Sequence, residues 1–406
     1  MELFAIVASL LAITALLAFL NERLIGLPTT IGVMLIALAI SVVVLVLGSL
    51  GVLQIAERAR ELVAAAALEE TLLGGMLSFL LFAGALHVDL GDLLDRWLEV
   101  GLFATLGVIV STALVALAAY ASANLLGLPL GFVWCLVFGA IVAPTDPVAV
   151  LAILRRSGVG AGLRALIAGE SLFNDGFAVV VFATLAGLAA GSVHLQAGEL
   201  ALFLAEEALG GAALGLVLGW LGYLALRTID SYQVEVLITL ALVAGGFALA
   251  GLLHVSGPLA VVVMGLLIGN RGRRLGMSEK TREHLDSFWE LLDEVLNAVL
   301  FVLIGLELLV LDLNPAALAA GAVAIVAVTG SRLLAVGGTM RLMRRSGGLV
   351  ATWAGLRGGI SVALALSLPA GGERELILTM TYVVVIFSIT VQGLTLQPLA
   401  SRRRSP

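Results

Sequence analysis

The sequence predicts an all-α polytopic membrane protein with 13 transmembrane helices, arranged as two inverted six-helix repeats. Three observations lead to this prediction. The 406 residues are 61% hydrophobic and only 12% charged, a composition typical of multi-spanning membrane proteins and not of soluble domains. Basic residues are distributed unequally between the two predicted sides of the membrane. Finally, two predicted helices at equivalent positions in the two halves are interrupted near their middles.

Thirteen apolar stretches are long enough to cross a bilayer, which takes roughly 20 helical residues. The N-terminal stretch has no basic residue before it, so we predict a retained first span and not a signal peptide. Residues 52–70 are too charged to span, and we expect an interfacial or extended helix there. The thirteen stretches lie at about 3–20, 29–48, 71–88, 98–123, 130–152, 164–190, 199–226, 233–251, 255–270, 288–311, 316–340, 349–369 and 376–399.

The basic residues support this span count and indicate an orientation. With thirteen spans, three Lys and Arg residues lie on the N-terminal side, seventeen lie on the opposite side, and two, Arg332 and Arg357, lie within spans. Because cytoplasmic loops carry the excess of basic residues, the N-terminus is predicted outside and the C-terminus inside, in a cytoplasmic membrane. The basic tail at 400–406 then anchors at the cytoplasmic face, and no nucleic-acid partner is predicted.

The span at 199–226 divides the chain into a first repeat at about 1–190 and a second at about 233–399. Because this linker crosses the membrane once, the second repeat enters from the opposite side and is inverted relative to the first. Gly211, Gly215 and Gly219 are four residues apart in the linker span and form a smooth face, which indicates close helix packing.

The fifth span of each repeat is predicted to be broken. Pro144 and Pro147 lie within "GAIVAPTDPVAV", where proline removes backbone donors and frees carbonyl groups at membrane depth. In the twelfth span Arg357 is followed directly by Gly358 and Gly359. A matched pair of broken helices is typical of secondary transporters, in which the substrate binds where the two breaks meet.

Ionisable groups in the middle of a span are costly and usually mark ion pathways, ion pairs or proton relays. Asp146, Glu170 and Asp175 are such groups. On a helix, Ser171 and Asp175 share one face, while Glu170 and Asn174 share another about 100° away. The first face offers a hydroxyl and a carboxylate, which are suitable oxygen ligands for a small monovalent cation. The second face is suited to ion pairing and hydrogen bonding.

Arg357 is a guanidinium within a span that is well placed to neutralise an acid; if it pairs with Glu170, Asp175 and Asp146 are left without a fixed counter-charge. A buried carboxylate of this kind is stable when it holds either a proton or a metal cation. Competition between the two ions at one site is sufficient for exchange, so we predict neither an enzyme nor a cofactor. Glu307 and Arg332 are expected to be structural.

The assembled motifs resemble those of the monovalent cation:proton antiporters of the NhaP and sodium/proton exchanger (NHE) type. The matching stretches are "APTDPVAV", "GESLFNDG", "NAVLFVLIGLEL" and "LRGGISVALAL", and the likeness extends over essentially the whole chain. The resemblance implies an NhaA/NhaP-like fold in which Asp175 is the ion-binding carboxylate. It further implies that Asp146, Ser171 and the backbone of Thr145 complete the sodium site. Glu170 is implied to pair with Arg357, and Asn174 to support the crossing of the broken helices.

The pair Asn174–Asp175 is associated in this family with electroneutral exchange, so the resemblance implies one sodium or lithium ion per proton. It also implies a homodimer in the lipid bilayer with a role in pH homeostasis. Some family members carry an acid in the third span, where this chain has Ala83 and Gly84, so that additional ligand is in doubt.

Three other functions would also use buried polar residues within the membrane. Potassium/proton antiport by the same mechanism is the main alternative, and a cation channel is a more distant one. An intramembrane aspartyl protease would also use two buried Asp residues, but its Gly-x-Gly-Asp pattern is missing from the sequence.

Overall fold

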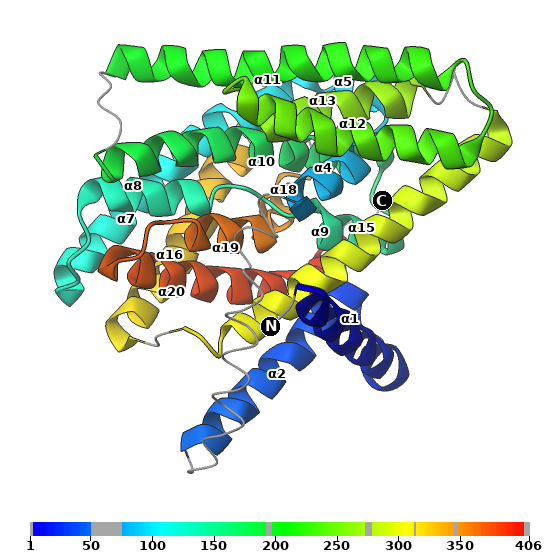
Figure 1. Ribbon diagram of the computed structural model, residues 1–406. Helices are drawn as coiled ribbons and strands as arrows, with labels where there is room; N and C mark the ends of the chain where they lie inside the picture. The colour runs from blue at the N-terminus through cyan, green and yellow to red at the C-terminus, as the bar shows by residue number, and fades with distance from the viewer. Residues whose placement is uncertain are drawn as a thin grey trace.

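The computed structural model describes residues 3–49, 75–191, 197–272, 278–311, 314–344 and 347–401. Within these ranges every regular element is a helix, some of them short π-helical segments labelled η (Figure 1). The interfacial segment predicted at 52–70 and residues 402–406 of the tail lie outside the described residues.

The helix bounds follow the chain in a simple order. They are α1 (Leu3–Leu20), η1 (Asn21–Ile25), α2 (Thr29–Ser49), α4 (Leu77–Leu86), α5 (Leu90–Leu94), α6 (Trp97–Ala104), α7 (Leu106–Leu126), α8 (Phe132–Ile141), α9 (Pro147–Ser157), α10 (Ala161–Ala189), α11 (Ala197–Leu226), α12 (Tyr232–Leu252), α13 (Gly257–Leu267), η3 (Ile268–Gly272), α15 (Glu279–Glu307), α16 (Pro315–Arg332), η4 (Leu333–Gly338), α17 (Thr339–Leu342), α18 (Gly348–Trp353), α19 (Gly359–Leu366), α20 (Gly372–Phe387), η5 (Ser388–Gln392) and α21 (Gly393–Ser401).

Each of the thirteen predicted stretches contains helix, which confirms the all-α membrane fold. In the described part of the chain, eight helices are long and apolar enough to cross a bilayer, judged by length and composition. Three further apolar helices, Leu77–Leu86, Phe132–Ile141 and Gly257–Gly272, are shorter. The number of thirteen crossings and the division into two inverted repeats remain predictions.

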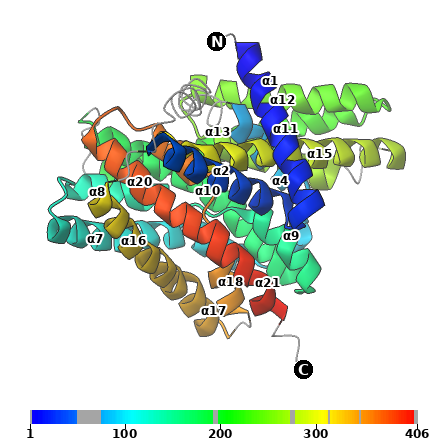
Figure 2. The same cartoon turned by 90° about the horizontal axis from the view of Figure 1, so that it is seen from below.

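The helices pack in two groups that meet around α10. Helices α7, α8, α16 and α20 contact one another on one side. On the other side, α13 contacts α11, α12 and α4, and α15 contacts α4, α12 and α2. Figures 1 and 2 show the same division, with α7, α8, α16 and α20 together and α11, α12 and α13 together. Because α10 contacts α8, α6 and α13, it places its polar residues between the two groups.

The two interruptions predicted from Pro and Gly are confirmed. Helix α8 ends at Ile141, residues 142–146 are not helical, and α9 begins at Pro147. Proline is favoured at the first helical position because its missing N–H would have no partner there. Similarly, α18 ends at Trp353 and α19 begins at Gly359. Each predicted span is therefore two short helices separated by irregular backbone.

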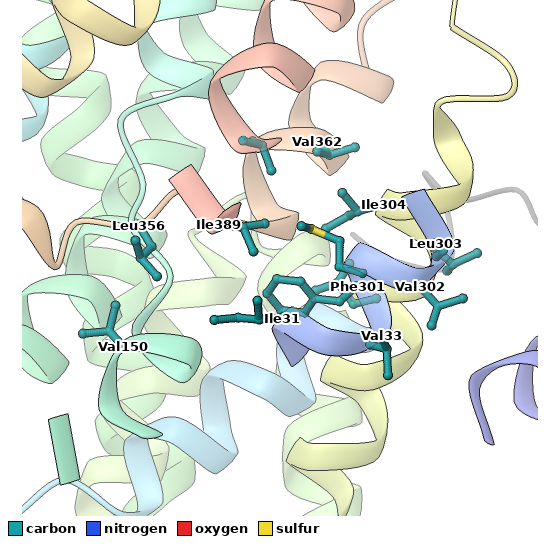
Figure 3. Close-up of a cluster of buried hydrophobic side chains, with 14 of the residues drawn as sticks. Ile31, Val33, Val150, Phe301, Val302, Leu303, Ile304, Leu356, Val362 and Ile389 are labelled. Atoms are coloured by element: carbon teal, nitrogen blue, oxygen red, sulfur yellow. The ribbon is translucent and has the colours of Figure 1, made fainter. Parts of the chain in front are cut away.

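A buried apolar cluster supports the second interruption. Figure 3 shows Ile31 of α2 and Phe301 of α15 packed near Leu356, which lies in the interruption, and near Val150 of α9. All four side chains are at most 1% exposed. Through this cluster the irregular backbone packs against α2 and α15, which are continuous helices. The break therefore has a defined position within the bundle.

The glycine face predicted on α11 packs against α13, as expected. A Cβ atom at Gly211 would meet the backbone of Ser256, and one at Gly215 would meet the backbone of Ala260. Gly219 lies against Met264 one helical turn further along. The absence of side chains therefore allows the two helix backbones to approach closely.

We expect Gly215→Val to lower the free energy of unfolding by about 1–3 kcal/mol, because its side chain would force α11 away from α13. Gly245→Val in α12 is the matched control, since a Cβ at Gly245 meets nothing within 4 Å. Thermal unfolding in detergent measures both. Equal effects of the two substitutions would mean that helix propensity, and not close packing, explains the loss.

Candidate functional site

The two helix interruptions cross each other inside the protein. The backbone N–H of Asp146 donates to the carbonyl oxygen of Leu356 over 2.7 Å, which joins the first break directly to the second. Gly358 lies against the Asp146 side chain, and a Cβ at this position would overlap the carboxylate. The second break therefore requires glycine for close approach to Asp146.

Arg357 binds the carbonyl groups freed by the first interruption. Its Nη1 atom donates to the carbonyl oxygen of Pro144 over 2.8 Å and also to that of Ala143. Its own backbone N–H donates to Ser388 Oγ at 2.8 Å. The side chain is 2% exposed, so these protein atoms replace its hydration. A cation at the C-terminal end of α8 is also favoured by the helix dipole.

Arg332, the last residue of α16, binds carbonyl groups at the end of α18, much as Arg357 binds those after α8. It also pairs with Glu170. Its Nη1 and Nη2 atoms lie 2.7 and 3.1 Å from the two Glu170 carboxylate oxygens, a bidentate arrangement. It also donates to the carbonyl oxygens of Thr352 and Ala351, over 3.1 and 3.2 Å. The prediction that Glu170 pairs with Arg357 is therefore wrong. Arg357 is used by the carbonyls of the first break, and Arg332 is the partner.

Asn174 holds the first break in place through Thr145. Its Oδ1 atom accepts from the Thr145 backbone N–H over 3.2 Å, and its Nδ2 atom donates to Thr145 Oγ1 over 2.9 Å. The Thr145 hydroxyl is also 2.8 Å from the Ser171 hydroxyl. All three residues are at most 1% exposed. Asn174 thus connects α10 to the crossing point of the broken helices.

The two acids of α10, Glu170 and Asp175, border different cavities. Glu170 and Asn174 border a small polar cavity together with Arg332 and Arg357. Asp175 borders a separate cavity at the crossing, which is lined by five predicted residues besides Asp175 and Asp146: Pro144, Thr145, Pro147, Gly358 and Gly359. The bundle therefore separates Glu170 and the two arginines from Asp175 and Asp146.

Of the two acids that α10 contributes, Asp175 is the one with a carboxylate oxygen that has no hydrogen-bond partner. It is 2% exposed, and its Oδ1 atom accepts no hydrogen bond. Asp146, which is only half-buried, lines the same cavity. Ser171 is not among the residues that line this cavity, but its hydroxyl is hydrogen-bonded to that of Thr145, which does line it.

The sequence predicted only part of the lining of this cavity. Leu77, Leu81 and Gly84 of α4 give it an apolar surface, in keeping with the absence of an acid in the third span. Asn297 of α15 also lines the cavity, and no role was assigned to it from the sequence. Its position at the start of "NAVLFVLIGLEL" was the available signal.

The chemistry of this cavity suits a hard, weakly bound ion. Two carboxylates, of Asp146 and Asp175, and two hydroxyl residues, Thr145 and Ser361, border it, and oxygen ligands of this kind accept a proton or an alkali cation. Among the described residues there is no group of three His, Cys, Asp or Glu side chains that could hold a metal ion.

A membrane protein with two crossing interrupted helices and buried acids between them has the architecture of a secondary transporter. The transmembrane model of the sodium/hydrogen exchanger family matches residues 9–402, so the chain belongs to this family. The family consists of transporters, which agrees with the prediction that the chain is not an enzyme.

Relatives match over most of their lengths. The chain is 48% identical to the Na⁺/H⁺ antiporter NhaP of Pseudomonas aeruginosa, with 98% of this chain and 96% of that protein covered. It is 36% identical to the Na⁺/H⁺ antiporter NhaH of Halobacillus dabanensis, over 90% of this chain and 91% of the relative. The structure of the sodium proton antiporter MjNhaP1 from Methanocaldococcus jannaschii has a TM-score of 0.76 and 22% identity. That alignment covers 98% of this chain and 99% of the other, and it supports the fold.

We expect a strong energetic coupling between Glu170 and Arg332. Removal of one partner from a buried ion pair costs about 3–5 kcal/mol, because the other charge is left without compensation. Glu170→Gln and Arg332→Gln should therefore each destabilise strongly, whereas the double variant should be clearly more stable than the sum of the two losses predicts. Unfolding in detergent measures this cycle.

The matched comparison is the cycle of Glu170→Gln with Arg357→Gln, because Arg357 donates its hydrogen bonds to the carbonyls of the first break. Its coupling energy should be smaller. A larger coupling in this second cycle would show that Arg357 is the true partner of Glu170.

Proposed function

We propose that this protein is an electroneutral sodium/proton antiporter, which also accepts lithium, in which cation and proton compete for Asp175 during alternating access. The observation that carries the proposal is the state of Asp175. It is buried in a cavity at the helix crossing, with one carboxylate oxygen unpartnered, while the nearby guanidinium groups are bonded elsewhere.

The distribution of positive charge explains why Asp175 can exchange its ion. Arg332 is committed to Glu170 and to the end of α18, and Arg357 is committed to the carbonyls after α8. A bare carboxylate in this environment is unstable, so a proton or a cation must accompany it. Since one group accepts either ion, entry of one ion requires departure of the other. Exposure of the site to each side in turn then couples the two fluxes.

Electroneutral exchange is supported by the role of Asn174. Both polar atoms of its amide bind Thr145, and the residue carries no charge. The Asn174–Asp175 pair therefore contributes one carboxylate, and one carboxylate releases one proton for each monovalent cation that it binds. We propose a ratio of one cation per proton.

Sodium is favoured because relatives similar over nearly their full length are named Na⁺/H⁺ antiporters. Asp146, Ser171 and the backbone of Thr145 are proposed to complete the site around Asp175. Potassium is the alternative, because the same oxygen ligands accept it. A cation channel would also need a polar path, but its flux would not be coupled to protons.

The proposal includes a setting and an assembly. We propose that the protein spans a cytoplasmic membrane with its N-terminus outside and its C-terminus in the cytoplasm, as the basic residues indicate. Two inverted repeats joined by α11 and a homodimer complete the proposed organisation, in which the exchanger contributes to pH homeostasis.

We expect Asp175→Ala to abolish exchange in proteoliposomes that hold a pH gradient, because neither ion then has a carboxylate to bind. Sodium, lithium or potassium is added outside, and internal pH is followed with a dye. Asp95→Ala, which removes an exposed acid, should leave the rate unchanged. Full activity of Asp175→Ala would contradict the assigned ion site, and a response to potassium alone would replace sodium as the substrate.

The wild-type rate is expected not to change when a membrane potential of either sign is imposed with potassium and valinomycin. Exchange of one cation for one proton moves no net charge, so the potential does no work on the cycle. The same dye assay, with sodium as the added cation, measures this. Acceleration by one sign of potential and slowing by the other would exclude electroneutral exchange.

A further inference from the structure

Among the polar side chains of the ion cavity, one on α15 has no role in the site described so far. Asn297 of α15 is 2% exposed and lines the cavity that also contains Asp146 and Asp175. Helix α15 contacts both α4 and α19, so Asn297 comes from a helix that packs beside the second broken span. A buried carboxamide with an accessible oxygen is a neutral ligand for an alkali cation.

The orientation of this carboxamide is determined by Asp293, one helical turn earlier. Asn297 Nδ2 donates to the backbone carbonyl oxygen of Asp293 over 2.9 Å and to Asp293 Oδ1 over 3.0 Å. Both of these atoms are hydrogen-bond acceptors. An amide oxygen in the same place would face two acceptors, which is unfavourable, so the NH₂ group must point toward Asp293.

It follows that the oxygen of Asn297 is the atom left for the cavity. Both N–H groups of the amide are used on the Asp293 side, and Oδ1 lies on the other branch of the planar group. A cation in the cavity would meet this oxygen, whereas the reverse orientation would present N–H groups and repel it.

We propose that Asn297 is an additional ligand of the transported cation and that Asp293 is the positioning residue that keeps its oxygen toward the ion. The inference rests on the proposed function. The additional oxygen comes from α15 and compensates for the missing acid of the third span, where Gly84 lines the cavity. The site then contains ligands from the broken helix before α9, from α10 and from α15.

Asp293 is well placed for this task. It is half-buried, it is hydrogen-bonded to Asn297, and it interacts electrostatically with Asp146. Asn124 makes the same type of bond to the carbonyl four residues earlier, since its Nδ2 donates to the carbonyl oxygen of Tyr120 over 2.8 Å. Asn124, however, lies on an exposed surface. This residue provides a matched control.

The test compares apparent KM and maximal rate for sodium in proteoliposomes, together with binding of radioactive sodium to the purified protein. Asn297→Leu keeps the shape and removes the oxygen, so we expect the apparent KM to rise by about tenfold or more with the maximal rate largely retained. Asn297→Asp keeps an oxygen toward the ion but loses both N–H bonds to Asp293, so its KM should rise less than that of Asn297→Leu. Asn124→Leu should change neither parameter.

A second variant tests the positioning role and guards against loss of folding in Asn297→Leu. Asp293→Asn offers an N–H donor to the Asn297 amide and permits the reversed orientation, so its apparent KM should rise as well. Glu294→Gln, which removes an equal charge from the exposed neighbouring position, should not have this effect.

The outcomes separate the inference from the function on which it rests. An unchanged KM in Asn297→Leu, or an equal rise in Asn297→Leu and Asn297→Asp, would overturn the ligand role while wild-type exchange stands. An unchanged KM in Asp293→Asn would overturn the positioning role. If the wild type exchanges none of sodium, lithium or potassium for protons, the proposed function itself fails.

Discussion

The structure depends on how the carbonyl groups at two helix interruptions are satisfied inside a membrane protein. Irregular backbone has no water to bind at this depth, so each exposed carbonyl must find a donor in the protein. Two buried arginines fulfil this requirement. Arg357 donates to the carbonyls that follow α8, and Arg332 donates to the last carbonyls of α18. Because each guanidinium has several donors in a fixed plane, it can serve these carbonyls and also hold another group.

This arrangement explains why the polar residues of α10 divide into two sets. Arg332 has donors left for Glu170, so that acid becomes part of the framework. Asn174 binds the backbone of the first break and adds a second connection from α10 to the crossing. Asp175 is five residues after Glu170 and faces another cavity, where no arginine neutralises it through a hydrogen bond. The same helix therefore provides both a rigid support and an acid that can change its ion.

Prediction from the sequence was most successful where the signal was local. Pro147 begins a helix and Gly358 permits close approach to Asp146, and both properties belong to the residue type itself. The separation of Glu170 and Asp175 onto different faces of α10 follows from helical periodicity. The prediction was wrong for Glu170, because Arg332 and Arg357 have the same chemistry and both lie within spans. Asn297 was missed as well, although it begins the stretch "NAVLFVLIGLEL", because a single amide has no distinctive spacing.

The sequence by itself determined that this chain is a helical membrane protein of the sodium/hydrogen exchanger family, with two interrupted helices and acids placed between them. Composition, proline and glycine positions, and motif spacing are properties of the chain, so they can be interpreted before folding. Only the tertiary structure decided which arginine meets Glu170, and which atoms of Asn297 are left to face the ion. Those choices depend on how helices that are far apart in the chain pack together. Arg332 Nη1 at the end of α16, for example, lies 2.7 Å from Glu170 Oε1 of α10.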